Sequence, residues 1–84
     1  MTPDAMRDYA GRYALASSTF QVSLFVEDGR LIATRPGVPA FELVPTQPNV
    51  FAPTIDAPAF IFERDSSGAV TTLVVGGTRL VRAR

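Results

Sequence analysis

The sequence predicts a small antiparallel β-barrel, and two observations carry that prediction. Short runs in which apolar and polar residues alternate recur along the chain, and Gly, Pro, Asp and Asn turn signals separate them at short intervals. The runs give about eight short strands with nearest-neighbour connections, and such a meander loses its exposed edges by closing on itself. We expect one all-β domain over residues 1–84, with a short helical turn at the N-terminus.

Length and composition limit what the chain can be. Its 84 residues allow one core, and with 46% of hydrophobic against 19% of charged residues it should fold rather than stay disordered. The formal net charge is zero, with acids and bases interspersed apart from a C-terminal group of Arg79, Arg82 and Arg84. Because nucleic-acid binding needs a basic stripe, we expect no nucleic-acid partner.

The N-terminal segment favours a short helix. In Thr2-Pro3-Asp4, the threonine suits the N-cap, the proline the first helical position and the aspartate the positive end of the helix dipole. Met6 and Tyr9 stand three apart, so a helix of about two turns would lay them on the sheet. Gly11 is expected to end it.

The segment 20–34 is expected to form the clearest hairpin. Asp28-Gly29 between two alternating runs favours a type I′ turn, and a two-residue loop fixes the register. Inside, Val26 then faces Leu31 and Leu24 faces Ala33, whereas outside Glu27 faces Arg30, Phe25 faces Ile32 and Ser23 faces Thr34.

The remaining strands follow the same reasoning. Tyr13 and Leu15 belong to a first short strand, and later strands are expected near residues 41–44, 50–52, 60–63 and 70–75. Gly76-Gly77 closes the last hairpin, in which Leu80 is expected to pair with Leu73. Prolines are expected to end strands at 36–39 and at Pro45, and 53–58 forms the longest irregular connection. Within 70–75 the inward parity changes, so either both faces are covered or a bulge near Thr71-Thr72 shifts the phase.

The residue types indicate that this chain does not catalyse a reaction by itself. The chain has no His, Cys, Lys or Trp, so no side chain can act as the usual base toward a serine, and no thiolate or Cys-ligated metal site can form. Asp28 and Asp65 sit in turn positions, where Asp favours local backbone hydrogen bonds, and Glu27 can pair with Arg30. No calcium-loop spacing occurs. We expect no enzyme activity, cofactor or metal.

The aromatic residues allow two interpretations. They can fill a core, or they can line an apolar ligand cavity whose mouth the 53–58 loop covers. Small eight-stranded barrels are filled by side chains, so the filled core is favoured and a small-molecule binder is the alternative.

Several short motifs together resemble a known family. These are Tyr9-Ala10-Gly11-Arg12-Tyr13, Gly29-Arg30-Leu31, Phe41-Glu42-Leu43-Val44-Pro45, Phe51, and 60–65 leading to Gly68, Val70 and Leu73. They resemble the lipocalin-like C-terminal accessory domain of bacterial β-lactamase-related, penicillin-binding-protein-like serine hydrolases. The resemblance covers nearly the whole chain. It implies a non-catalytic barrel whose partner is a serine hydrolase domain, in cis or in trans, because the nucleophile of those enzymes lies in a separate domain. The matched positions expected to fill the core are Tyr13, Phe41, Phe60, Phe62 and Leu73.

The outer face of the predicted hairpin is the candidate interaction surface. Phe25 and Ile32 form an apolar pair, flanked by Glu27 and Arg30. An apolar centre in a polar frame is typical of a contact site, either for a hydrolase domain or for a second copy of this chain. The alternative is that the N-terminal helix covers the pair. We expect a soluble chain without membrane insertion, and its compartment stays open, since an export signal could belong to a longer parent.

Overall fold

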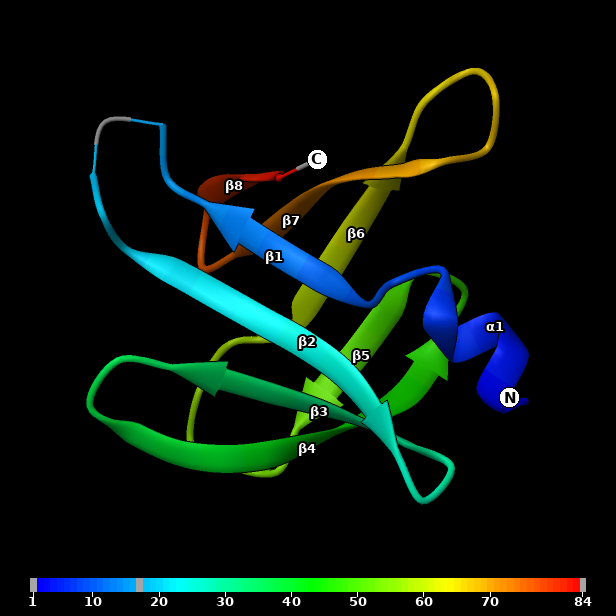
Figure 1. Ribbon diagram of the computed structural model, residues 1–84, viewed down its shortest axis with the longest axis horizontal. Coiled ribbons are helices and arrows are strands. Elements are labelled where there is room, and N and C mark those ends of the chain that lie inside the picture. The colour runs from blue at the N-terminus through cyan, green and yellow to red at the C-terminus, as the bar shows by residue number, and fades with distance from the viewer. Residues whose placement is uncertain (1, 17, 84) are drawn as a thin grey trace.

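The computed structural model describes residues 2–16 and 18–83, and its eight strands close into an antiparallel barrel (Figure 1). The strands follow one another around the barrel in chain order, and β1 closes it by pairing with β8. The elements are α1 (Pro3–Arg7), β1 (Gly11–Ala14), β2 (Gln21–Glu27), β3 (Arg30–Arg35), β4 (Val38–Gln47), β5 (Val50–Pro53), β6 (Phe60–Arg64), β7 (Val70–Val75) and β8 (Thr78–Arg82). The predicted fold class is confirmed.

The hairpin of β2 and β3 has the expected register. All five predicted cross-strand pairs are present, including Phe25 opposite Ile32 and Glu27 opposite Arg30. Asp28 and Gly29 have φ angles of 53° and 73°, as a type I′ turn requires at its two central residues. The hydrophobic alternation and this turn therefore specify the same pairing.

The change of parity in β7 results from a bulge. Arg64 pairs with Val70 while Glu63 pairs with Thr72, which leaves Thr71 as the extra residue. Val70 and Leu73 can both be buried as a result. Of the two interpretations of this strand, the bulge is confirmed.

The N-terminal helix is shorter than expected. Thr2 caps it, with its side chain accepting a hydrogen bond from the Ala5 amide, but the helix ends at Arg7. Tyr9 therefore lies beyond the helix, and Gly11 opens β1 with a φ of 145° instead of ending α1. About one and a half helical turns are enough to place Met6 in the core.

Of the two proline expectations, the first holds in part and the second is wrong. As expected, β3 ends at Arg35, directly before Pro36. The turn after β3 contains only Pro36 and Gly37, so Pro39 already belongs to β4. Pro45 also lies inside β4, paired with Phe51, rather than ending a strand. A register shift between Pro45 and Gln47 explains this position, since bulges tolerate a residue that cannot donate a backbone hydrogen bond.

Side chains fill the barrel. The buried core is apolar and draws on every strand and on the N-terminal segment, with Tyr13, Leu31, Leu43, Phe51 and Leu73 fully inaccessible. Edge-to-face contacts join Phe62 to Tyr9, Tyr13 and Phe51. The other residues expected to fill the core, Phe41 and Phe60, are buried as well, so that expectation is confirmed.

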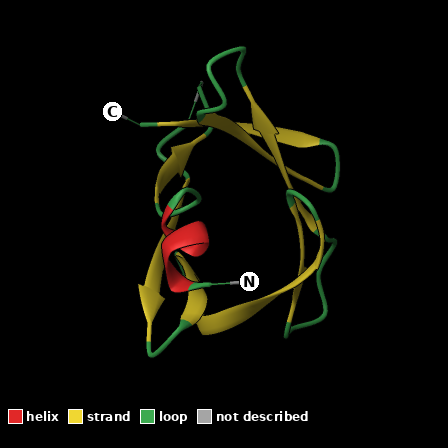
Figure 2. Cartoon of the chain, turned by 90° about the vertical axis from the view of Figure 1, so that its right-hand side faces the viewer, coloured by secondary structure: helices red, strands yellow, loops and turns green. Residues whose placement is uncertain are grey.

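The two ends of the barrel differ. Helix α1 contacts β2 and β3 at the end where β1 begins, and in Figure 2 it lies within the ring of strands. We call this the helix end, which also carries the turns at 28–29, 48–49 and 65–69. The opposite end, called the mouth, is formed by residues 15–16 and 18–20 and by the connections 36–37, 54–59 and 76–77.

Candidate functional site

The predicted outer pair is where the sequence placed it. Phe25 is 38% exposed and Ile32 is half-buried on the neighbouring strand. The alternative that residues 3–9 bury both side chains is wrong, because Phe25 stays exposed while Met6 and Tyr9 belong to the interior cluster. The pair therefore remains available on the outer wall.

The charged frame of this pair differs from the expected one. Glu27 and Arg30 are opposite each other in the ladder, but Arg30 forms its ion pair with Glu42, with Nη1 and Oε1 4.0 Å apart. Glu42 is also the residue that faces Ile32 on β4. The frame is therefore shared between three strands, and Glu42 is the member that local sequence reasoning missed.

A second apolar row runs along the outer wall. Ile61, 44% exposed, lies opposite Val50 on one side and Val74 on the other. Val44 is also exposed; it lies on β4 two residues after Glu42, the residue that faces Ile32, and opposite Ala52 on β5. The same alternation that identified Phe25 marks these positions, because each stands between two inward-facing residues.

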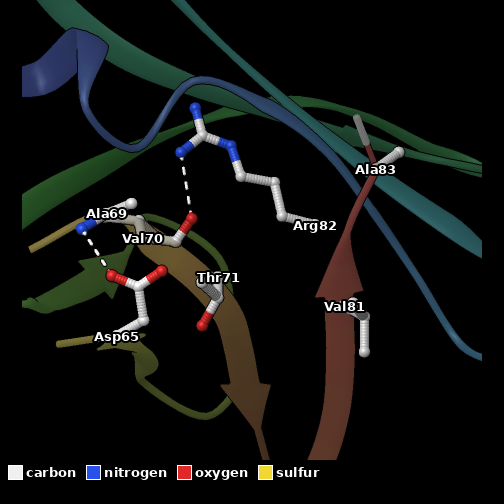
Figure 3. Close-up of a pocket in the computed structure, with 7 residues that line it drawn as sticks. All are labelled: Asp65, Ala69, Val70, Thr71, Val81, Arg82 and Ala83. Carbon is white, nitrogen blue, oxygen red and sulfur yellow. Dashed lines mark hydrogen bonds between the residues drawn. The ribbon is translucent and has the colours of Figure 1, made fainter. Parts of the chain in front are cut away.

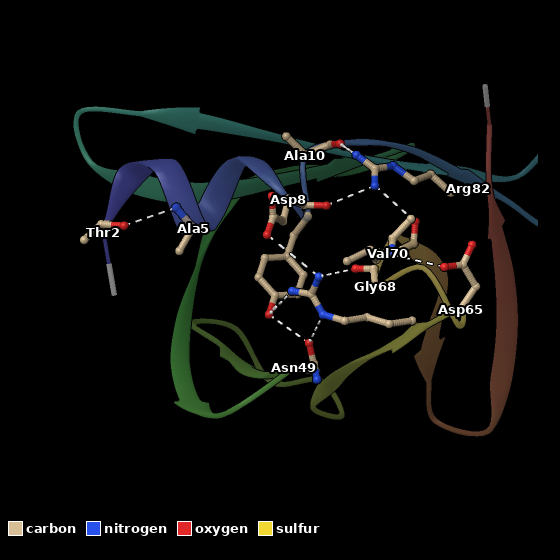
Figure 4. A network of polar contacts seen from close by, with 12 residues as sticks. Thr2, Ala5, Asp8, Ala10, Asn49, Asp65, Gly68, Val70 and Arg82 are labelled. Atoms are coloured by element: carbon tan, nitrogen blue, oxygen red, sulfur yellow. Dashed lines mark hydrogen bonds and ion pairs between the residues drawn. The ribbon is translucent and has the colours of Figure 1, made fainter.

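A polar network secures the helix end (Figure 4). Arg64 donates hydrogen bonds from Nε to Asn49 Oδ1 at 2.8 Å, from Nη1 to the Gly68 carbonyl at 2.7 Å and from Nη2 to Tyr9 Oη at 3.1 Å. Its Cζ lies 5.1 Å from the centre of the Tyr9 ring, and its Nη1 lies 3.8 Å from Asp8 Oδ2, with which it forms an ion pair. The position of Tyr9 outside the helix is thus fixed by Arg64.

Arg82 holds the chain in a similar way on the other side of the helix end. Its guanidinium donates to the carbonyls of Asp8, Val70 and Ala10. A Cβ at Gly11 would lie 3.1 Å from Arg82 Nε, so a glycine is needed where the two meet. The expected group of C-terminal arginines is therefore divided: Arg79 pairs with Glu63 outside, Arg82 turns inward, and Arg84 lies outside the described residues.

Tyr13 links this network to the core. Its hydroxyl donates to the Tyr9 carbonyl at 2.8 Å, and the residue is fully buried. Burial raises the pKa of Tyr13 to about 12, although the nearby Arg82 acts in the opposite direction. Because the guanidinium groups of Arg64 and Arg82 and the hydroxyl of Tyr13 donate hydrogen bonds within the protein, the helix end is a structural closure.

A shallow groove lies between β7 and β8 (Figure 3). Its volume is about 430 Å³, and Asp65, Thr71, Val81 and Arg82 are among the residues that line it. The Asp65 carboxylate accepts hydrogen bonds from Ser67 and from the Ala69 amide, and these bonds lower its pKa. This confirms the expected turn role of Asp65, whose Oδ1 accepts all three bonds from within its own turn.

The mouth holds a smaller pocket of a different character. Its volume is about 160 Å³, and its lining is apolar except for Thr78 and Arg35: Phe20, Val22, Phe60, Val75 and Leu80. Arg35 Nε is buried without a hydrogen-bond partner among the described residues. Sequence reasoning did not single out Arg35, although its parity with Leu31 and Ala33 could have shown that it faces inward.

The described residues hold neither a metal-binding cluster nor a membrane-spanning helix. Within 2–16 and 18–83, no three acidic side chains come together in a way that could hold a metal ion. None of the described helices is long and apolar enough to cross a membrane.

The described residues form a closed, eight-stranded meander barrel with an apolar pair on its outer wall. Comparisons with known proteins identify the fold of this barrel and go no further. No family model matches the chain, and no curated protein matches it. Among solved structures, the crystal structure of SurE is similar, with a TM-score of 0.79 and 23% identity. The match covers 99% of this chain and 20% of the SurE chain, so this chain spans about a fifth of that protein. The similarity shows the barrel fold.

Proposed function

We propose that this barrel is a non-catalytic accessory domain that packs against a serine hydrolase domain of the β-lactamase-related class, in the same polypeptide or as a separate chain. The observation that carries the proposal is the exposed Phe25 beside Ile32 at the centre of a charged frame. Aromatic residues are enriched in protein interfaces, and charged residues collect at the rim.

The structural comparison supports an accessory role. The part of the SurE chain that resembles this barrel makes up 20% of that chain. A barrel of this kind therefore occurs joined to other protein. The class of partner rests on the resemblance of the motifs in 9–13, 41–45 and 60–73 to the lipocalin-like appendage of serine hydrolases.

The residue types support the non-catalytic part. Without His or Lys, the serines have no side-chain base, and the arginines at the helix end hold carbonyl groups. The filled core supports an interaction module over a barrel that encloses a large apolar ligand.

The test is a binding measurement with a double variant. The catalytic domain is taken from the same or the adjacent reading frame, and its affinity for the barrel is measured by calorimetry. Phe25→Ser with Ile32→Thr is expected to weaken binding by about 30-fold or more, since the loss of an interface anchor costs about 2 kcal/mol or more. The circular dichroism of the variant should remain that of a β-protein.

A matched control uses the second apolar row. Ile61→Thr lies on the opposite part of the outer wall and should leave this affinity unchanged. Equal affinity of the wild type and the Phe25 and Ile32 variant would refute the proposed surface. If the wild-type chain instead forms a dimer that the same double variant dissociates, the partner is a second copy and the hydrolase assignment fails.

A further inference from the structure

The mouth of the barrel contains an arginine, Arg35, for which the described residues supply no hydrogen-bond or ion-pair partner, and this sets the mouth apart from the helix end. Arg35 is the last residue of β3 and follows the inward-facing Leu31 and Ala33 after a register shift; it is half-buried and lines the pocket at the mouth. Its Nε is buried, yet no hydrogen bond or ion pair among the described residues includes it. A buried donor without an acceptor is unfavourable, most of all on a charged group.

No ion pair among the described residues neutralises Arg35 at the mouth. Of the connections that form the mouth, only 54–59 contains an acidic residue, Asp56, which is exposed. This loop packs against the turn after β7, since Pro58 Cγ lies 3.3 Å from the position of a Cβ on Gly76. The loop that the sequence suggested as a lid thus lies at this end, although its residues do not line the pocket.

The surroundings of Arg35 favour an amphipathic ligand. Val22, Phe60 and Leu80 form a buried apolar floor, whereas Arg35 and Thr78 provide the polar groups of the lining. Water could accept hydrogen bonds from the guanidinium, but it would form no favourable contacts with the apolar floor. A pocket of about 160 Å³ is close to the size of a cavity of about 150 Å³ that holds a benzene ring.

From these observations we propose that the mouth binds small carboxylates that carry one aromatic or branched hydrocarbon group. The hydrocarbon occupies the floor formed by Val22, Phe60 and Leu80. The carboxylate lies at the rim, where it accepts hydrogen bonds from the Arg35 guanidinium, which matches its geometry. This site is separate from the outer pair on β2 and β3, so the proposal does not depend on the proposed hydrolase partner.

The test compares a carboxylate with its neutral analogue. Phenylacetate and phenylacetamide are titrated into the ¹⁵N-labelled protein, and amide chemical shifts are followed by NMR. Phenylacetate is expected to produce saturable shifts in residues 20–22, 35, 60 and 75–80, and phenylacetamide should bind about tenfold more weakly or worse, because it lacks the charge-assisted hydrogen bonds.

Variants then assign the interaction to its residues. Arg35→Gln should reduce phenylacetate binding to the level of phenylacetamide. Arg12→Gln, a change at an exposed arginine of β1 that does not line the pocket, should leave it unchanged. Val75→Phe, which fills the pocket but keeps the guanidinium, should abolish binding of both compounds.

Three results would overturn the proposal. The first is equal binding of the acid and the amide by the wild type, a comparison that needs no variant. The second is undiminished binding by a folded Arg35→Gln protein. The third is the absence of saturable shifts at the mouth up to tens of millimolar, which would show that water alone occupies the pocket.

Discussion

Replacing Phe62 with alanine tests how the barrel is stabilised. Phe62 is 3% exposed and has edge-to-face contacts with Tyr9, Tyr13 and Phe51, at centroid distances of 4.8, 5.8 and 5.6 Å. Deleting a buried phenylalanine costs about 3–5 kcal/mol, and each aromatic pair adds about 0.5–1.5 kcal/mol to its burial. We expect a loss near the upper end of that range.

This loss is large for a chain of this size. At about 0.05–0.15 kcal/mol per residue, the 84 residues give a free energy of unfolding of about 4–13 kcal/mol. In urea unfolding followed by far-UV circular dichroism, Phe62→Ala should lower the midpoint by about 2 M or more, given a slope of about 1–3 kcal/mol per molar urea. At the low end of the stability range the variant would be unfolded in water.

Phe25→Ala is the matched control, because it makes the same change on the outer face. Phe25 is 38% exposed, so its loss should cost about 1 kcal/mol or less in an isolated chain. If Phe25→Ala lowered the midpoint as much as Phe62→Ala, the assignment of inner and outer faces would be refuted.

Three further predictions concern the turn, the chemistry and the pH dependence. Gly29→Val should lower the free energy of unfolding, measured by chemical denaturation, by about 1–2 kcal/mol. The cause is left-handed backbone strain alone, because the nearest atom to a Cβ at this position, Pro3 Cγ, is 3.9 Å away and does not clash. An unchanged midpoint would mean that the turn is of another type. The purified chain should not hydrolyse a chromogenic ester, and steady turnover by a homogeneous preparation would contradict the proposed non-catalytic role. Since the pKa of Tyr13 is raised from 10.0 to about 12 in the folded protein, its contribution to stability is complete below pH 10 and should be lost as the pH rises towards 12. Tyr13→Phe should remove this part of the pH dependence, and an identical profile in the variant would argue against the burial of the hydroxyl.

The parts of the fold that the sequence predicted are those in which two local signals agree. Around 28–29, the alternation and the Asp-Gly turn each fix the register, so the amino-acid sequence is enough to place the outer pair. Around Pro45 the only signal was the rule that proline ends strands, and the bulge that admits it depends on pairing with β5. Long-range pairing of this kind has no local signature.

The orientation of the arginines at the candidate sites was likewise not predicted from the sequence. Hydrophobic periodicity assigns a face only to apolar residues, so an arginine at a strand end is taken as solvated. Arg64 continues the inward row of Phe60 and Phe62, and Arg82 continues that of Leu80. Parity alone could have predicted that both turn inward, but their acceptors come from segments distant in sequence, such as Asp8 and Asn49.

Three strands of the barrel therefore end their inward row with an arginine, and the two ends use it differently. At the helix end, the chain returns over the opening, and its carbonyl groups and Tyr9 occupy Arg64 and Arg82. At the mouth no such segment among the described residues engages Arg35, which keeps a buried donor beside an apolar floor. Arg64 and Arg82 close the helix end because their hydrogen bonds are formed within the chain. Arg35 has no such partner among the described residues, so the mouth is the end of the barrel at which a small anion can bind.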